Sequence, residues 1–153
     1  MSGDNARTGP AATDYTLGRM RTILLGLVAL GLAGTAAELF LMAHTEDTLQ
    51  LVPFAAMLLA FVAIVWRLAA PRRAAVVAVR IAMGVMMVTG AIGSALHFQA
   101  NMEFQLELDK SLTGMPLIMK VLEAKSPPAL APGNMALLGC IGLAGVYRER
   151  FGG

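Results

Sequence analysis

The sequence predicts an all-α fold, an integral membrane four-helix bundle with a short extramembrane amphipathic helix. Of its 153 residues, 57% are hydrophobic and only 14% are charged, whereas about 25% of residues are charged in soluble domains. The mean hydropathy is +0.67, which is typical of a membrane protein and excludes a soluble enzyme. The chain has one cysteine, which excludes an internal disulfide and thiol–disulfide exchange.

Four apolar segments are candidates for crossing a bilayer, whose hydrocarbon core of about 30 Å needs roughly 20 helical residues. They are residues 23–42, 49–66, 76–98 and 132–147. Pro53 lies near the start of the second segment, where it can kink the helix if neighbours satisfy the freed carbonyl. The fourth segment is short, with about 24 Å of helix, and needs a thin bilayer or help from the residues before it.

The basic residues predict the orientation of these spans. Every arginine lies before the first span, around the connection between the second and third, or after the fourth. The opposite side holds three lysines and six acidic residues. By the positive-inside rule, both termini and the second connection are cytoplasmic. We therefore expect a multi-pass inner-membrane protein, N-in and C-in.

The remaining segments complete the predicted organisation. Residues 1–19 show no apolar periodicity and are expected to form a disordered cytoplasmic tail before a membrane domain over 20–153. An alternative for the N-terminus is a signal peptide cleaved before Glu38. Because the apolar run continues past Glu38 to Met42, a membrane span is the better interpretation.

The long outer loop, residues 99–131, has predicted structure of its own. No Gly or Pro interrupts residues 98–112, so the third helix should continue to about Leu108. Pro116 is well placed near the start of a second, short helix. Its apolar residues form one stripe: Met115, Ile118, Met119 and Leu122. This helix is expected to lie on the outer membrane surface or to cap the bundle.

Small and polar residues share one face of two spans, which should point into the bundle because small residues permit close helix packing. On the third span they are Gly90, Gly93, Ser94, His97 and Asn101. On the first span they are Gly31, Gly34, Thr35 and Glu38. Glu38 and His97 lie at similar depths, about 24 to 26 Å above the arginines of their helices. An intramembrane carboxylate needs a partner, so the first interpretation is a polar clamp between Glu38 and His97.

Ligand sites at the same place are further hypotheses. Imidazole and carboxylate groups suit zinc or copper(II), and Met42 or Met102 could supply a soft ligand for copper(I). The candidate metal ligands are Glu38, His44, His97 and Asn101, with Glu103 as an additional one. His44 and His97 could instead be the axial ligands of a haem. A quinone or a lipid headgroup is also compatible, so the cofactor stays open.

Several short runs carry a family resemblance. They are Ala37–Leu39, His44–Asp47, Gln50–Pro53, His97–Phe98, Asn101 and Glu103–Phe104. In these runs the chain resembles small four-span bacterial inner-membrane proteins to which no activity is assigned. The resemblance covers residues 20–147 and implies the topology alone.

The function predicted from the sequence is an accessory or partner-binding membrane subunit. Glycine stripes on the third and fourth spans would be its contact faces, and Cys140 beside Gly139 and Gly142 would be a small apolar residue among them. The expected partners are the lipid bilayer, a membrane protein or a second copy. The alternative is a membrane protein that binds a metal, haem or small ligand. No catalytic, nucleotide-binding or nucleic-acid-binding motif occurs in the sequence.

Overall fold

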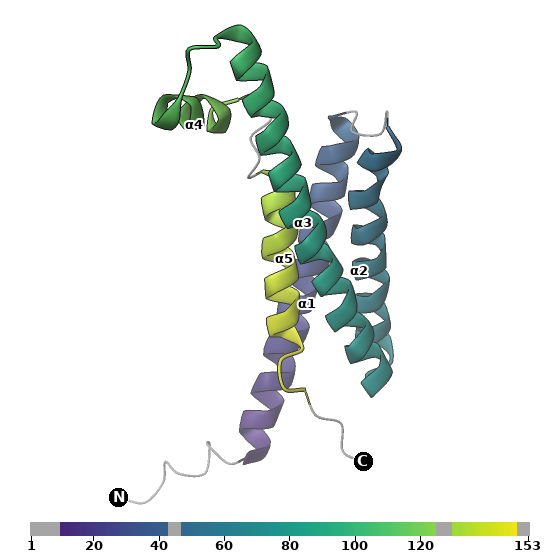
Figure 1. The fold of residues 1–153 in the computed structure, drawn as a ribbon. Coiled ribbons are helices and arrows are strands. Elements are labelled where there is room, and N and C mark those ends of the chain that lie inside the picture. The colour runs from purple at the N-terminus through teal and green to yellow at the C-terminus, as the bar shows by residue number, and fades with distance from the viewer. Residues whose placement is uncertain (1–9, 43–46, 125–129, 150–153) are drawn as a thin grey trace, which may run out of the picture.

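The protein is mostly helical, with no strand, in the residues that the computed structural model describes, which are 10–42, 47–124 and 130–149. The elements are α1 (Pro10–Leu41), the 3-10 helix η2 (Thr48–Leu51), α2 (Val52–Ala69), α3 (Arg73–Leu108), α4 (Gly114–Leu122) and α5 (Ala131–Gly145). Helices α1, α2, α3 and α5 pack into a bundle, and α4 lies apart beside the far end of α3 (Figure 1). The predicted all-α class is confirmed.

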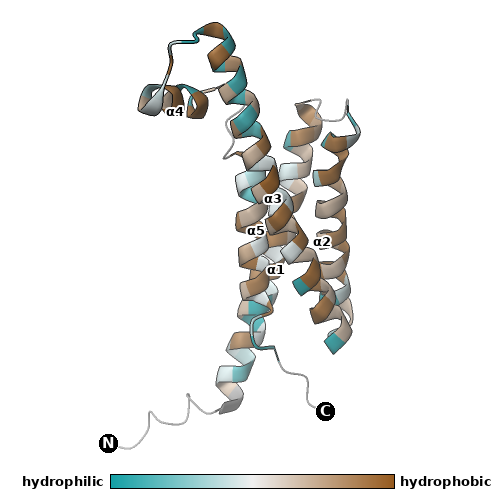
Figure 2. Ribbon diagram, in the orientation of Figure 1, coloured by the Kyte–Doolittle hydropathy of each residue, from teal (hydrophilic) through white to brown (hydrophobic). Residues whose placement is uncertain are grey.

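Three helical segments of the described chain are long and apolar enough to cross a membrane: Ala12–Leu41, Thr48–Ala69 and Arg73–Leu108. Helix α5 is also apolar but shorter. Large apolar side chains such as Leu30, Leu58 and Val88 lie on the outside of the bundle, and hydrophobic residues dominate α2 and the neighbouring part of α3 (Figure 2). An apolar exterior of this extent indicates a membrane protein.

The first helix begins earlier than the sequence predicted. We expected residues 1–19 to be disordered, but α1 begins at Pro10, so residues 10–19 are helical, and residues 1–9 lie outside the described part. Proline is tolerated in the first turn of a helix, where its missing N–H needs no partner. The alanines and Leu17 that follow are good helix formers, which favours continuation into the apolar run.

The second and third helices agree closely with the prediction. The turn of η2 precedes α2, and Pro53 occupies the first turn of α2, so no interior carbonyl loses its bond there. The predicted extension of the third span is confirmed, since α3 continues to Leu108. Helix α5 is one residue earlier at its start and two residues shorter at its end than the predicted fourth span.

Helix α5 packs against both α1 and α3 through small residues. A Cβ atom on Gly90 of α3 would lie 2.5 Å from the backbone oxygen of Pro132, and a Cβ on Gly139 of α5 would lie 2.9 Å from that of Met83. On the other side, Gly31 of α1 faces Leu138. The glycine stripes are therefore filled by contacts within the chain, which corrects our expectation that those on the third and fourth spans are contact faces for a partner.

Arginines from three helices converge on the residues after α5, at what we call the arginine end of the bundle. Arg21 of α1 donates to the Tyr147 carbonyl (3.1 Å), and Arg80 of α3 donates to the Val146 carbonyl (3.2 Å). Arg67 of α2 forms an ion pair with Glu149. Cations are favoured near the C-terminal end of a helix, so these arginines, which bind residues just after the last turn of α5, stabilise that end.

The opposite end, which we call the histidine end because His97 lies there, carries the turn from α3 to α4. Asp109 accepts bonds from the Ser111 hydroxyl (2.6 Å) and backbone N–H (2.9 Å), and these bonds hold the pKa of Asp109 below its ordinary value because they favour the carboxylate. Gly114 has a φ of +61°, which favours glycine where the chain turns into α4. The Asn101 side chain donates to the Val121 carbonyl (3.4 Å) and ties α4 to α3.

Candidate functional site

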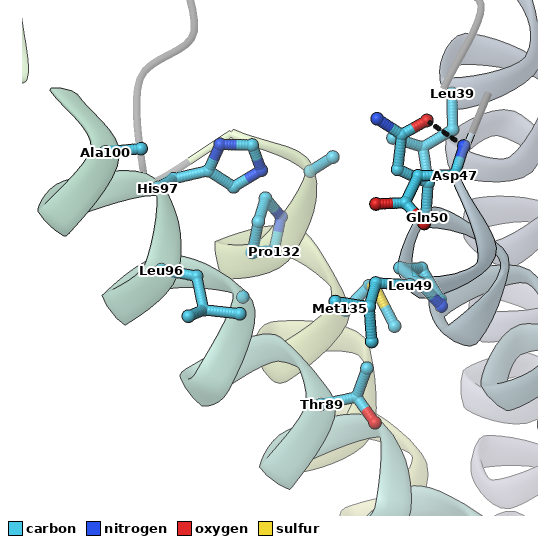
Figure 3. Close-up of a pocket in the computed structure, with 13 residues that line it drawn as sticks. Leu39, Asp47, Leu49, Gln50, Thr89, Leu96, His97, Ala100, Pro132 and Met135 are labelled. Atoms are coloured by element: carbon cyan, nitrogen blue, oxygen red, sulfur yellow. Dashed lines mark hydrogen bonds between the residues drawn. The ribbon is translucent and has the colours of Figure 1, made fainter. Parts of the chain in front are cut away.

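A crevice of about 450 Å³ opens at the histidine end, between η2 and α3. We call it the histidine crevice (Figure 3). It is lined by Leu39 of α1, by Asp47, Leu49, Gln50 and Pro53 around η2, by Thr89, Gly93, Leu96, His97 and Ala100 of α3, and by Ala131, Pro132 and Met135 of α5. The volume lies within the range of small-molecule sites, about 300 to 1,000 Å³.

The crevice results from the way α3 packs. Near the arginine end α3 lies beside α2, where buried alanines such as Ala60 and Ala63 permit close contact. Towards the histidine end α3 diverges from α2 (Figure 1). There Gly90 and Gly93 allow α3 to pack closely against Pro132 of α5. The side chains between the two helices leave part of this gap open.

Polar groups gather at the mouth of the crevice. The His97 ring points from α3 toward η2, and Asp47 and Gln50 face it from the other side (Figure 3). The Asp47 N–H donates to the Gln50 side chain (3.4 Å), and the Gln50 N–H donates to the Asp47 carbonyl (3.0 Å). These two bonds fix the turn that presents both side chains.

The inner part of the crevice is mainly apolar. Its walls are the side chains of leucine, proline, alanine and methionine residues, and Thr89 is the deepest polar residue (Figure 3). Thr89 lies two turns along α3 from His97, or about 12 Å. The site therefore combines a hydrogen-bonding mouth with a long apolar interior, which suits a molecule with a polar head and an apolar body.

The residues that the sequence assigned to one site have different surroundings in the structure. His97 lines the crevice, whereas Glu38 is exposed on α1 and is not among the lining residues. Asn101 faces α4 through its bond to Val121, and Glu103 accepts a bond from Gln99 (2.9 Å). His44 lies outside the described residues. Among the residues that are described, no three His, Cys, Asp or Glu side chains form a group suited to a metal ion.

The predicted small-residue face of α1 is divided between two environments. Gly31 and Thr35 face α5, where Thr35 is 3% exposed and accepts a bond from the Asn134 amide (2.6 Å). Gly34 faces open space, and Glu38 is exposed. Gly34 lies about 60° from Gly31 and about 100° from Thr35 around the helix, and Glu38 lies about one turn beyond Thr35, so α5 covers only one edge of this face.

Four polar residues of this end were missing from the predicted site: Asp47, Gln50, Thr89 and Asn134. Asp47 and Gln50 have the spacing of a helix N-cap and its third residue, which could have indicated that their side chains are ordered. Thr89 and Asn134 carry only the weak signal of a polar residue in an apolar run. Nothing in that pattern indicates whether such a residue faces a cavity or a neighbouring helix.

Comparison with known proteins adds no functional assignment. No protein-family model matches the chain, and neither the curated proteins nor the solved structures give a match. The geometry of the histidine crevice is therefore the basis for a functional proposal.

Proposed function

We propose that this chain is a four-span protein of the bacterial inner membrane that binds a small amphiphilic molecule in the histidine crevice. The observation that carries the proposal is the crevice itself, with its polar mouth and apolar interior. An amphiphile would place its head beside Asp47 and His97, where it can exchange hydrogen bonds. Its apolar body would extend toward Thr89 and Met135, and the apolar area removed from water would provide most of the affinity.

The charges of α3 support the membrane placement. Residues 81–102 of α3 contain no Asp, Glu, Lys or Arg, and as a helix they cover about 33 Å, close to the thickness of a bilayer hydrocarbon core. Arg80 lies at one edge of this stretch and Glu103 at the other. With the arginine end in the cytoplasm, the mouth of the crevice is at the outer membrane boundary.

This topology gives a prediction for reporter fusions. A reporter fused after Gly153 should be active in the cytoplasm, and a reporter inserted near Thr113 should be active on the outer side, because the arginines resist translocation. As a control, each position would carry two reporters in separate fusions, one that is active only in the cytoplasm and one that is active only outside it. A C-terminus on the outer side would contradict the four-span topology.

The metal and haem hypotheses have less support from the described geometry. Glu38 is not among the residues that line the crevice, and the inner walls of the crevice are mainly apolar. We therefore favour an organic amphiphile such as a quinone or a lipid. Elemental analysis and a visible spectrum of the purified protein would detect a metal or a haem directly.

Filling the crevice should abolish ligand retention. We expect Thr89→Trp to lose a co-purifying amphiphile, because the indole would occupy the inner crevice. The matched control is Val88→Trp, since the adjacent Val88 side chain is 59% exposed on the outside of the bundle. Each protein would be purified in polymer-bounded native nanodiscs, and the extracted small molecules would be compared by liquid chromatography and mass spectrometry.

Comparing the extracts of the three proteins distinguishes a crevice ligand from bulk lipid. Bulk lipid should be extracted from both variants in the same amount, whereas a crevice ligand should be enriched in the wild type and in Val88→Trp only. Equal extracts from all three proteins would contradict ligand binding at this site. A melting temperature for Thr89→Trp close to that of the wild type would exclude unfolding as the cause of a loss.

A second candidate function is that of an accessory subunit, and the exposed face of α1 favours it. A Cβ on Gly34 would meet no atom within 4 Å, and Glu38 is exposed on the same side. A partner helix could approach closely at Gly34 and give Glu38 a hydrogen bond.

If α1 binds such a partner, Gly34→Leu should remove a stoichiometric protein from native-membrane purifications. Gly84→Leu, which also adds a side chain into open space, should retain it. Retention in both variants would contradict this role for α1.

A further inference from the structure

Helix α4 keeps its apolar stripe uncovered. Val121 is fully buried against the rest of the protein, but the stripe residues are substantially exposed: Met115 by 66%, Ile118 by 40%, Met119 by 48% and Leu122 by 46%. At 100° per residue, these four side chains fall within a sector of about 100°, and Lys120 lies about 150° from its centre. The helix is therefore amphipathic, and the centre of its stripe is turned about 110° from Val121, the buried contact residue.

The position of α4 along α3 is fixed by a hydrogen bond. The Asn101 side chain donates to the Val121 carbonyl, and Asn101 lies at the end of the charge-free stretch of α3. This point is about 32 Å along the helix from Arg80. Helix α4 thus lies at the level where the hydrocarbon core would end in the membrane placement proposed above.

The orientation of α4 also matches a membrane boundary. It crosses α3 instead of running along it, and it lies on the side of α3 away from α2 (Figure 1). It therefore does not close the bundle between α2 and α3, which disfavours the capping role that the sequence left open. A nine-residue helix is too short to be stable in water by itself, so its apolar face needs a partner.

We propose that α4 is an interfacial helix that inserts its apolar stripe between the headgroups and acyl chains of the outer leaflet. Lys120, on the opposite side of the helix, remains among the phosphates and water. The occupant of this surface is lipid, because the exposed apolar stripe lies at the level where the apolar exterior of the bundle ends. This inference rests on the proposed membrane placement and is independent of ligand binding in the crevice.

Site-directed spin labelling tests the proposal. In a Cys140→Ser background, single cysteines would replace Met119, Lys120 or Val88, and each labelled protein would be reconstituted in vesicles of phosphatidylcholine and phosphatidylglycerol. Collision rates with molecular oxygen, which concentrates in lipid, would be compared with those of a water-soluble nickel chelate. We expect the labels at Met119 and Val88 to favour oxygen and the label at Lys120 to favour nickel. All three side chains are exposed, so labelling should preserve the fold.

Other results would overturn the proposal. If the Met119 label favours nickel as strongly as the Lys120 label while the Val88 label favours oxygen, α4 lies in water. If the Met119 label collides with neither reagent, protein covers the stripe. If the Val88 label itself favours nickel, the proposed membrane placement is wrong, and the inference about α4 fails with it.

Discussion

Replacing Gly90 by Ala should destabilise the bundle by about 1 to 3 kcal/mol, the range for overpacked sites. The new methyl carbon would lie 2.5 Å from the Pro132 backbone oxygen and 2.8 Å from the Ala136 nitrogen. Backbone atoms of α5 cannot move aside as a flexible side chain can, so α3 and α5 would have to separate. Thermal unfolding in detergent, followed by circular dichroism, measures the effect.

The matched control is Gly84→Ala on the same helix. A Cβ on Gly84 meets no atom within 4 Å, so alanine there should be neutral or stabilising by up to about 1 kcal/mol through helix propensity. Equal melting temperatures for the two variants would show that α3 and α5 do not pack as closely at Gly90 as the structure indicates.

Breaking the ion pair between Arg67 and Glu149 should also lower the free energy of unfolding substantially. The side chains are only 13% and 8% exposed, and Arg67 Nε also donates to Glu149 Oε2 at 3.1 Å. Removal of one partner leaves a charge that is partly shielded from water. We expect Arg67→Met to destabilise by more than the ~1 kcal/mol of exposed pairs and by less than the ~3 to 5 kcal/mol of fully buried ones.

A double-mutant cycle isolates the pair. Arg67→Met combined with Glu149→Met should be more stable than the sum of the single effects predicts, because the second substitution removes the stranded charge. Unfolding in detergent with increasing denaturant gives the free energies of unfolding of the wild type, the two single variants and the double variant. Additivity within about 0.5 kcal/mol would contradict a direct interaction at the arginine end.

Much of the fold was predictable because the apolar runs are long. The hydrophobic pattern predicted the three long helices, and the absence of Gly and Pro over residues 98–112 predicted the extension of α3 to Leu108. The position of Pro116 and the apolar stripe predicted the short helix α4. The start of α1 was missed because residues 10–19 carry no apolar periodicity, although their helix propensity is adequate. Propensity alone is a weak signal compared with periodicity.

The candidate site was predictable only in part, because the depth of a residue along its helix does not indicate which way its side chain points. Counting residues from the arginines gave Glu38 and His97 similar depths, but it did not indicate which way each side chain points. Helix α5 packs on the edge of α1 that carries Thr35, and Glu38 lies outside that contact. The crevice itself depends on the divergence of α3 from α2, which arises from packing on Pro132 and has no signature in either helix alone.

The most direct test of ligand binding uses methyl groups as probes. Met135 lines the histidine crevice, whereas Met86 is fully buried in the core and is not among the crevice residues. Deuterated protein with ¹³C-labelled methionine methyls would be prepared in deuterated detergent and titrated with a protonated lipid extract of the native membrane. We predict intermolecular nuclear Overhauser effects from extract protons to the Met135 methyl and none to the Met86 methyl. The absence of such effects at Met135, or equal effects at both methyls, would contradict a ligand in the crevice.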